Sequence, residues 1–109
     1  HQRDIASKIL KAYGYRVNSV GSGEEAMEYL KNKSVDLVLL DMLMGPNMNG
    51  RQTYEEIVKI HPGQKAVIVS GFSQNDEVKK ARKLGAEGFL KKPYSMEQLA
   101  SAVLKELQK

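Results

Sequence analysis

The chain has 109 residues with a hydrophobic fraction of 41% and a charged fraction of 28%, which predicts a folded single domain over residues 1–109 and excludes a disordered chain. Seventeen Lys and Arg residues against 13 Asp and Glu residues give a net charge of +4, which raises the question of nucleic-acid binding. Cysteine is absent, so disulfide scaffolds, thiolate nucleophiles and cysteine-ligated metal sites are excluded.

The N-terminal third is predicted to contain a helix, a strand and a second helix. Apolar residues at helical spacing, followed by a glycine, predict a helix over residues 2–13. Bulky and polar residues alternate in YRVNSV, which predicts a strand over residues 15–20. Ser22 and Glu25 have the spacing of a capping box, which predicts that the second helix begins there and runs to about Asn32.

The middle of the chain is predicted to hold two strongly apolar strands with a helix between them. VDLVLL, residues 35–40, is nearly continuous in Val and Leu, as in a parallel strand that is covered on both faces. Loop residues 42–50 follow, and an apolar stripe then predicts a third helix, which ends at Pro62-Gly63. AVIV, residues 66–69, predicts the next strand.

The C-terminal third continues the alternation of helices and strands. We predict a helix over residues 75–84, a short strand over residues 88–90, and a last helix that begins with the capping-box pair Ser95 and Gln98. Helices that connect successive strands imply parallel strands joined by right-handed crossovers. The predicted fold class is therefore α/β, with a parallel sheet between two layers of helices.

Polar residues follow three of the predicted strands at the point where each strand ends. These residues are Asp41, Ser70 and Lys92. In an open parallel sheet, ligands bind outside the carboxyl ends of the strands, so we expect the three side chains to lie together. A carboxylate can act as nucleophile or metal ligand, a hydroxyl can donate to a phosphoryl oxygen, and an ammonium can neutralise its charge. Taken singly, each residue is more often a cap or turn residue than a functional one.

Three segments, VDLVLLDMLMGPNMNG, AVIVSGFS and LGAEGFLKKPYS, resemble in order and spacing the motifs of response regulator receiver domains. The resemblance covers the whole chain. It implies a flavodoxin-like, doubly wound parallel sheet with strand order 2-1-3-4-5. It also implies that the domain is not an enzyme with a separate substrate, because Asp41 would itself accept a phosphoryl group from a histidine kinase or a phosphotransfer domain.

The resemblance assigns a role to further residues around this phosphoacceptor. Ser70 would bond the phosphoryl group, and Lys92 would pair with it next to a cis peptide bond to Pro93. Phe89 occupies the aromatic switch position, whose side chain moves inward when the hydroxyl residue is drawn to the phosphate. Phosphorylation would then change the partner affinity of the face formed by the last two helices and the strand between them.

A magnesium ion is implied as the cofactor, with departures from the family pattern at its site. Mg²⁺ would be held by Asp41 and by the backbone carbonyl of Leu43. The family's first strand and its acidic pair are absent, because the chain starts inside the first helix. We therefore expect that the domain is N-terminally truncated, or that it rearranges or exchanges strands. Gly45 lengthens the following loop by one residue, and Asn49 stands where the family usually has Asp.

The resemblance also implies partners and a cellular place. The partners would be a histidine kinase or phosphotransfer domain and a downstream output domain or protein, with a homodimer left open. Hybrid histidine kinases carry such receivers at their C-termini. No apolar run approaches the roughly 18 residues of a membrane span and no targeting segment is visible, so we expect a cytoplasmic protein.

Two alternatives compete with a phosphorylated receiver. A pseudo-receiver would use the fold for partner binding alone, which the missing acidic pair favours and the joint presence of Asp41, Ser70 and Lys92 opposes. Direct nucleic-acid binding is opposed by the 6% aromatic content and the lack of a DNA-binding motif. Its candidate patch would comprise Lys79, Lys80, Arg82, Lys83, Lys91 and Lys92. The sequence lacks the motifs of an independent small-molecule enzyme.

Overall fold

Helices and strands alternate along the chain, as the computed structural model shows for residues 2–18, 20, 22–42, 49–71 and 76–109. The elements are α1 (Gln2–Ala12), α2 (Gly23–Asn32), β1 (Val38–Asp41), α3 (Gly50–Ile60), β2 (Ala66–Ser70), α4 (Asp76–Lys83), β3 (Gly88–Lys91) and α5 (Met96–Leu107). All five predicted helices and three of the four predicted strands are therefore confirmed. Asn75, the expected start of α4, lies outside the described residues.

The described strands form one parallel sheet with the order β1-β2-β3. This order matches the last three strands of the expected arrangement 2-1-3-4-5. β1 begins at Val38, three residues later than predicted. Before it, the backbone carbonyl of Val35 accepts a hydrogen bond from the side chain of Gln64. The backbone N–H of Val38 is the first in this strand to bond across the sheet, to the carbonyl of Lys65 at 3.0 Å.

The predicted strand over residues 15–20 is wrong for the part that the structure describes. Residues 15–18 and 20 are not part of a strand, although Tyr15 and Val17 are half-buried while Arg16 and Asn18 are exposed. Tyr15 and Val17 pack against the core between α1 and α5. The alternation in the sequence therefore reports packing on one side, while a strand also needs a hydrogen-bonded neighbour, and no described strand runs beside this segment.

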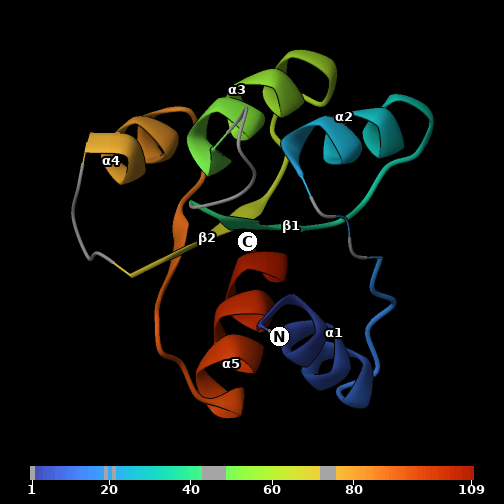
Figure 1. Ribbon diagram of the computed structural model, residues 1–109, viewed down its shortest axis with the longest axis vertical. Helices are drawn as coiled ribbons and strands as arrows, with labels where there is room; N and C mark the ends of the chain where they lie inside the picture. Colours follow the sequence, from blue (N-terminus) through green and yellow to red (C-terminus); the bar gives the residue numbers. More distant parts are fainter. Residues whose placement is uncertain (1, 19, 21, 43–48, 72–75) are drawn as a thin grey trace.

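Helices cover both faces of the sheet, with α2, α3 and α4 on one side and α1 and α5 on the other (Figure 1). Each side has its own core of buried side chains. The core under α2, α3 and α4 comprises Leu30, Leu40, Met42, Tyr54, Ile57, Ala66, Ile68, Val78, Ala81 and Ala86. The core under α1 and α5 comprises Ala6, Leu10, Val67, Val69, Leu90, Leu99 and Val103.

β2 lies between the two cores and is buried along its whole length. Ala66 and Ile68 belong to one core, and Val67 and Val69 belong to the other. This two-sided burial explains the continuous apolar run in the sequence, because a strand with one solvated face would alternate. None of the described helices is long and apolar enough to cross a membrane.

Candidate functional site

The three residues predicted at strand ends lie at the same edge of the sheet. Asp41 is the last residue of β1, Ser70 is the last residue of β2, and Lys92 directly follows β3. The register aligns Asp41 with Val69, and Ser70 with Lys91. The strands therefore end within one residue of each other, which brings the carboxylate, the hydroxyl residue and the ammonium to one edge.

The side chains of Asp41 and Lys92 form an ion pair across β2. The Nζ atom of Lys92 donates a hydrogen bond to Oδ2 of Asp41 at 2.5 Å. Lys92 is held in place from its backbone too, because its N–H donates to the carbonyl of Ser70 at 2.8 Å. The side chain of Lys92 is 18% exposed and that of Asp41 is 37% exposed, so the carboxylate remains accessible from solvent. The peptide bond between Lys92 and Pro93 is cis.

Ser70 is buried to 2% exposure, and it lies two residues after Ile68, which packs in the core under α3 and α4. Side chains alternate along a strand, so Ser70 shares this side with Ile68, and Phe89 of β3 is the register partner of Ile68. Phe89 is half-buried and packs against the same core. The structure therefore places Ser70 and the predicted switch residue Phe89 on one side of the sheet.

The first residues of α3 pack directly against the end of β1. A Cβ atom added at Gly50 would lie 2.8 Å from the backbone oxygen of Asp41, so a side chain here would displace backbone. Asn49 caps the helix: its side chain accepts from the N–H of Gln52 at 2.8 Å, and the Gln52 side chain accepts from the Asn49 N–H at 3.0 Å. This capping box was not predicted, although the spacing of Asn49 and Gln52 was a readable signal for it.

Tyr94 is a neighbour of the ion pair that the strand-end argument did not include. The residue is half-buried and packs against the core of α1 and α5. The pKa of its phenol is raised above the ordinary value, mainly by burial. The charge of Lys92 lowers this pKa and the charge of Asp41 raises it. The charges of both Asp41 and Lys92 therefore act on the Tyr94 phenol. Tyr94 packs against the core on the opposite side of the sheet from Phe89.

The described residues do not complete a ligand set for Mg²⁺. No group of three or more His, Asp or Glu side chains converges in the described ranges. Mg²⁺ prefers near-octahedral oxygen ligands, and the carboxylate of Asp41 is engaged by Lys92. Leu43, the predicted carbonyl ligand, and Gly45 lie outside the described residues. The magnesium ion thus stays a prediction.

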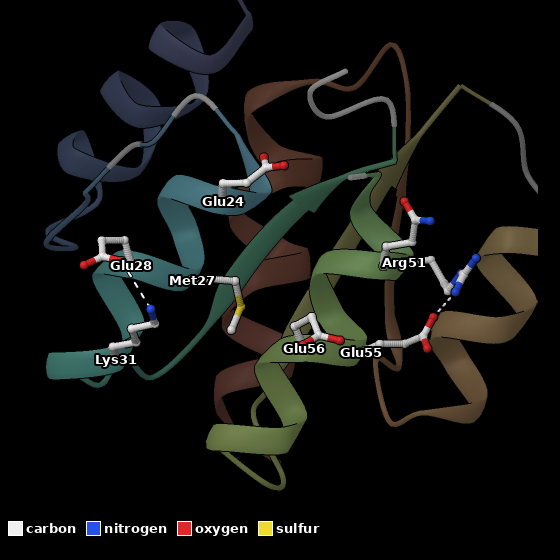
Figure 2. Close-up of a pocket in the computed structure, with 8 residues that line it drawn as sticks. Glu24, Met27, Glu28, Lys31, Arg51, Glu55 and Glu56 are labelled. Atoms are coloured by element: carbon white, nitrogen blue, oxygen red, sulfur yellow. Dashed lines mark hydrogen bonds and ion pairs between the residues drawn. The ribbon is translucent and has the colours of Figure 1, made fainter. Parts of the chain in front are cut away.

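A groove of about 730 Å³ lies away from these residues, between α2 and α3 (Figure 2). Glutamates dominate its wall, and its cations are paired within it, Lys31 with Glu28 and Arg51 with Glu55. Its lining residues are Glu24, Met27, Glu28, Lys31, Arg51, Gln52, Glu55 and Glu56. Asp41, Ser70 and Lys92 are not among them, so the candidate site is the edge of the sheet where the strands end and not this groove.

Comparisons with known proteins find relatives over nearly the whole chain. A family model described as the response regulator receiver domain matches residues 1–104. The chain is 38% identical over 107 residues to the sensor kinase CckA of Brucella abortus, a match that covers 94% of this chain and 11% of the kinase. It is 35% identical over 104 residues to the chemotaxis protein CheY of Thermotoga maritima, covering 94% of this chain and 86% of that protein.

Solved structures show the same likeness in three dimensions. A response regulator receiver domain protein (CheY-like) from Methanospirillum hungatei superposes with a TM-score of 0.89 at 26% sequence identity. That match covers 96% of this chain and 83% of the other. The chain thus spans a small part of the sensor kinase and most of the CheY-like proteins, which indicates that the same kind of domain occurs in both contexts.

Proposed function

The chain belongs to the response regulator receiver domain family of two-component signalling, and from this premise we propose that Asp41 accepts a phosphoryl group from a histidine kinase or a phosphotransfer domain. The observation that carries the proposal is the contact of 2.5 Å between the Asp41 carboxylate and the Lys92 ammonium, at a strand end next to Ser70. The carboxylate is accessible enough to act as a nucleophile toward a phosphoryl group. The cation fixed beside it can stabilise the negative charge of that group.

The transfer is a displacement at phosphorus. A carboxylate oxygen of Asp41 forms a new bond to phosphorus, while the bond between phosphorus and the imidazole nitrogen of the donor breaks. The electron pair of the broken bond stays on that nitrogen, and the product on this chain is an acyl phosphate. Later attack of water on this acyl phosphate returns the carboxylate and releases inorganic phosphate, so the domain assists its own transfer and hydrolysis without turning over a separate substrate.

Lys92 and Ser70 support this step with charge and hydrogen bonding. The Lys92 ammonium, already at Asp41, neutralises part of the negative charge that the phosphoryl oxygens bring. The Ser70 hydroxyl donates to a phosphoryl oxygen when the group is present. Receiver domains generally bind Mg²⁺ at an acidic pocket, but the roles of Lys92 and Ser70 follow from their own positions.

A switch of the partner-binding face follows from the shared position of Ser70 and Phe89. Movement of Ser70 toward a phosphoryl group opens space on the side of the sheet that Phe89 occupies. Phe89 belongs to β3, which lies between α4 and α5 in the chain. We propose that its reorientation changes the surface offered to an output domain or protein. Because histidine kinases draw their phosphate from ATP, we place this exchange in the cytoplasm.

The test is intact-mass analysis and peptide mapping after treatment with a small phosphodonor in the presence of Mg²⁺. We expect the mass of one phosphoryl group on the Asp41 peptide, and no modification of Asp41→Asn. Asp36→Asn is the matched control, because it removes an exposed carboxylate just before β1 and leaves the site intact. A folded chain that stays unmodified, or an Asp41→Asn variant that is modified as fast as the parent, contradicts the proposal and favours a pseudo-receiver.

A further inference from the structure

The ring of Phe89 is in contact with a cation from the neighbouring helix. The guanidinium carbon of Arg82, in the last turn of α4, lies 6.0 Å from the centroid of the Phe89 ring. We infer that Arg82 is a positioning residue, which holds Phe89 in its present orientation and biases the switch toward the unmodified state. This inference deepens the proposed function and rests on it for the meaning of the switch.

The core covers only part of the Phe89 ring, and Arg82 lies over the ring. Phe89 packs against the core under α2, α3 and α4, and Ile68 is its register partner on β2. Phe89 is only half-buried, so the core does not enclose the ring completely. Arg82 is itself exposed, and its guanidinium lies at the distance at which a cation is attracted to an aromatic face.

The charges near Arg82 give it little else to bind. Its neighbours on α4 include Lys79, Lys80 and Lys83, which repel it. No carboxylate of the described ranges forms an ion pair with Arg82. The carbonyl end of the α4 dipole attracts Arg82, but it attracts Lys83 in the same turn equally. The contact with the Phe89 ring is therefore what distinguishes Arg82 from Lys83.

The contact joins α4 to β3, the strand that carries the proposed switch residue. α4 begins shortly after Ser70 in the chain, and β3 carries Phe89. The contact with Arg82 coexists with the pairing of Asp41 and Lys92, which belongs to the unmodified carboxylate. If Phe89 turns away when Ser70 moves, the cation–ring attraction is lost. Removing Arg82 should then shift the equilibrium between the two ring orientations by about two- to fivefold away from the present one.

The experiment observes the Phe89 ring by NMR in the unmodified chain. The sequence contains only two phenylalanines, so selective labelling of Phe rings gives two sets of signals, and Phe89→Leu assigns them. We expect Arg82→Gln to shift the Phe89 signals and Lys83→Gln to leave them in place. Arg82→Lys keeps the charge and should restore part of the shift. Urea unfolding of the three variants should give the same midpoint. A change in the Phe89 signals then reports ring orientation and not a loss of folding.

A second measurement links the ring to phosphorylation and separates the two proposals. At a subsaturating concentration of phosphodonor, the ratio of modified to unmodified Asp41 should rise about two- to fivefold in Arg82→Gln and stay unchanged in Lys83→Gln. Phe89 signals that respond equally to Arg82→Gln and Lys83→Gln overturn the inference, even if Asp41 is phosphorylated. Phe89 signals that respond only to Arg82→Gln support the positioning contact. If Asp41 then stays unmodified, this result contradicts the proposed function but not the contact between Arg82 and Phe89.

Discussion

The carboxylate of Asp41 is paired with the ammonium of Lys92, and the Asp41 side chain is 37% exposed. Its partner Lys92 is mostly buried, and the backbone of Lys92 is tied to Ser70 at the end of β2. A long, flexible ammonium is thereby fixed at a single place. Because the pair is partly exposed, water screens it, and such pairs contribute at most about 1 kcal/mol to the free energy of unfolding. We therefore assign Lys92 to the chemistry of Asp41 more than to the stability of the fold.

Replacement of Lys92 by Gln separates these two contributions. We expect the rate of phosphoryl acceptance by Asp41 to fall by about 100-fold or more, because a fixed charge at the phosphoryl oxygens is lost. The free energy of unfolding should change by no more than about 1 kcal/mol. Stopped-flow or mass-resolved phosphorylation gives the rate, and urea unfolding gives the stability. Lys91→Gln, which removes an exposed cation one residue earlier, should keep the parent rate, and an equal loss in both variants would argue against a specific role of Lys92.

Sequence reasoning located these residues because the ends of parallel strands converge. Asp41, Ser70 and Lys92 could be placed at one edge from the apolar runs that precede them, without any knowledge of side-chain orientation. The direct pairing of Asp41 with Lys92 could not be predicted in that way. It depends on the register of β1, β2 and β3, and a shift of one residue would have moved a side chain to the other face.

The start of α3 is the element-scale support of the site. Gly50 allows the helix to touch the backbone of Asp41, and the Asn49 capping box satisfies N–H groups at this same end. The sequence departs here from the family's usual Asp, and the structure shows that Asn performs the capping. Asn49 therefore determines where α3 begins and how it approaches β1.

Loss of this cap should destabilise the domain. We expect Asn49→Ala to lower the free energy of unfolding by about 1 kcal/mol, because the N–H of Gln52 loses its partner. Asn49→Ser should retain most of the stability, since its hydroxyl can accept the same hydrogen bond. Urea unfolding of the three proteins measures the difference. If Ala and Ser lowered the stability equally, the capping bond would not be its source.

The segment after α1 shows the limit of reasoning from alternation. Half-buried Tyr15 and Val17 alternate with exposed Arg16 and Asn18, as in a strand, yet the described part of this segment forms none. Side-chain periodicity is a local property and is visible in one sequence. A ladder depends on a neighbouring strand, which local periodicity does not specify. For β2 the same reasoning succeeded, because its burial on both faces leaves an unambiguous apolar run.

At the scale of the whole molecule, Tyr54 contacts several elements around the core under α2, α3 and α4. The residue lies on α3, is buried to 1% exposure, and donates a hydrogen bond from its phenol to the carbonyl of Gln64 at 2.7 Å. The phenol also faces the turn after α4, because a Cβ atom at Gly85 would lie 3.3 Å from it. A hydrogen bond thus joins α3 to the approach to β2, and the turn before β3 lies close to the same phenol.

The pKa of Tyr54 makes the stability of this arrangement depend on alkaline pH. Burial raises the pKa above its ordinary value of 10.0, and the charges of Glu106 and Glu87 raise it further. Below pH 10.0 the phenol is protonated in both the folded and the unfolded chain, so its contribution to stability is fully present. As the pH rises above this value, the unfolded chain ionises the phenol first. The free energy of unfolding must then fall until the folded-state pKa is passed.

Tyr54→Phe isolates this contribution from the other groups that titrate at high pH. At neutral pH we expect the variant to be less stable by about 1 kcal/mol, because the Gln64 carbonyl loses its donor. Above pH 10.0 the difference between parent and variant should shrink, since the variant has no phenol to ionise at this position. Urea unfolding across this range measures both curves, with Tyr13→Phe as the control for loss of an exposed phenol. A gap between parent and Tyr54→Phe that stays constant with pH would mean that the buried phenol does not couple proton release to unfolding.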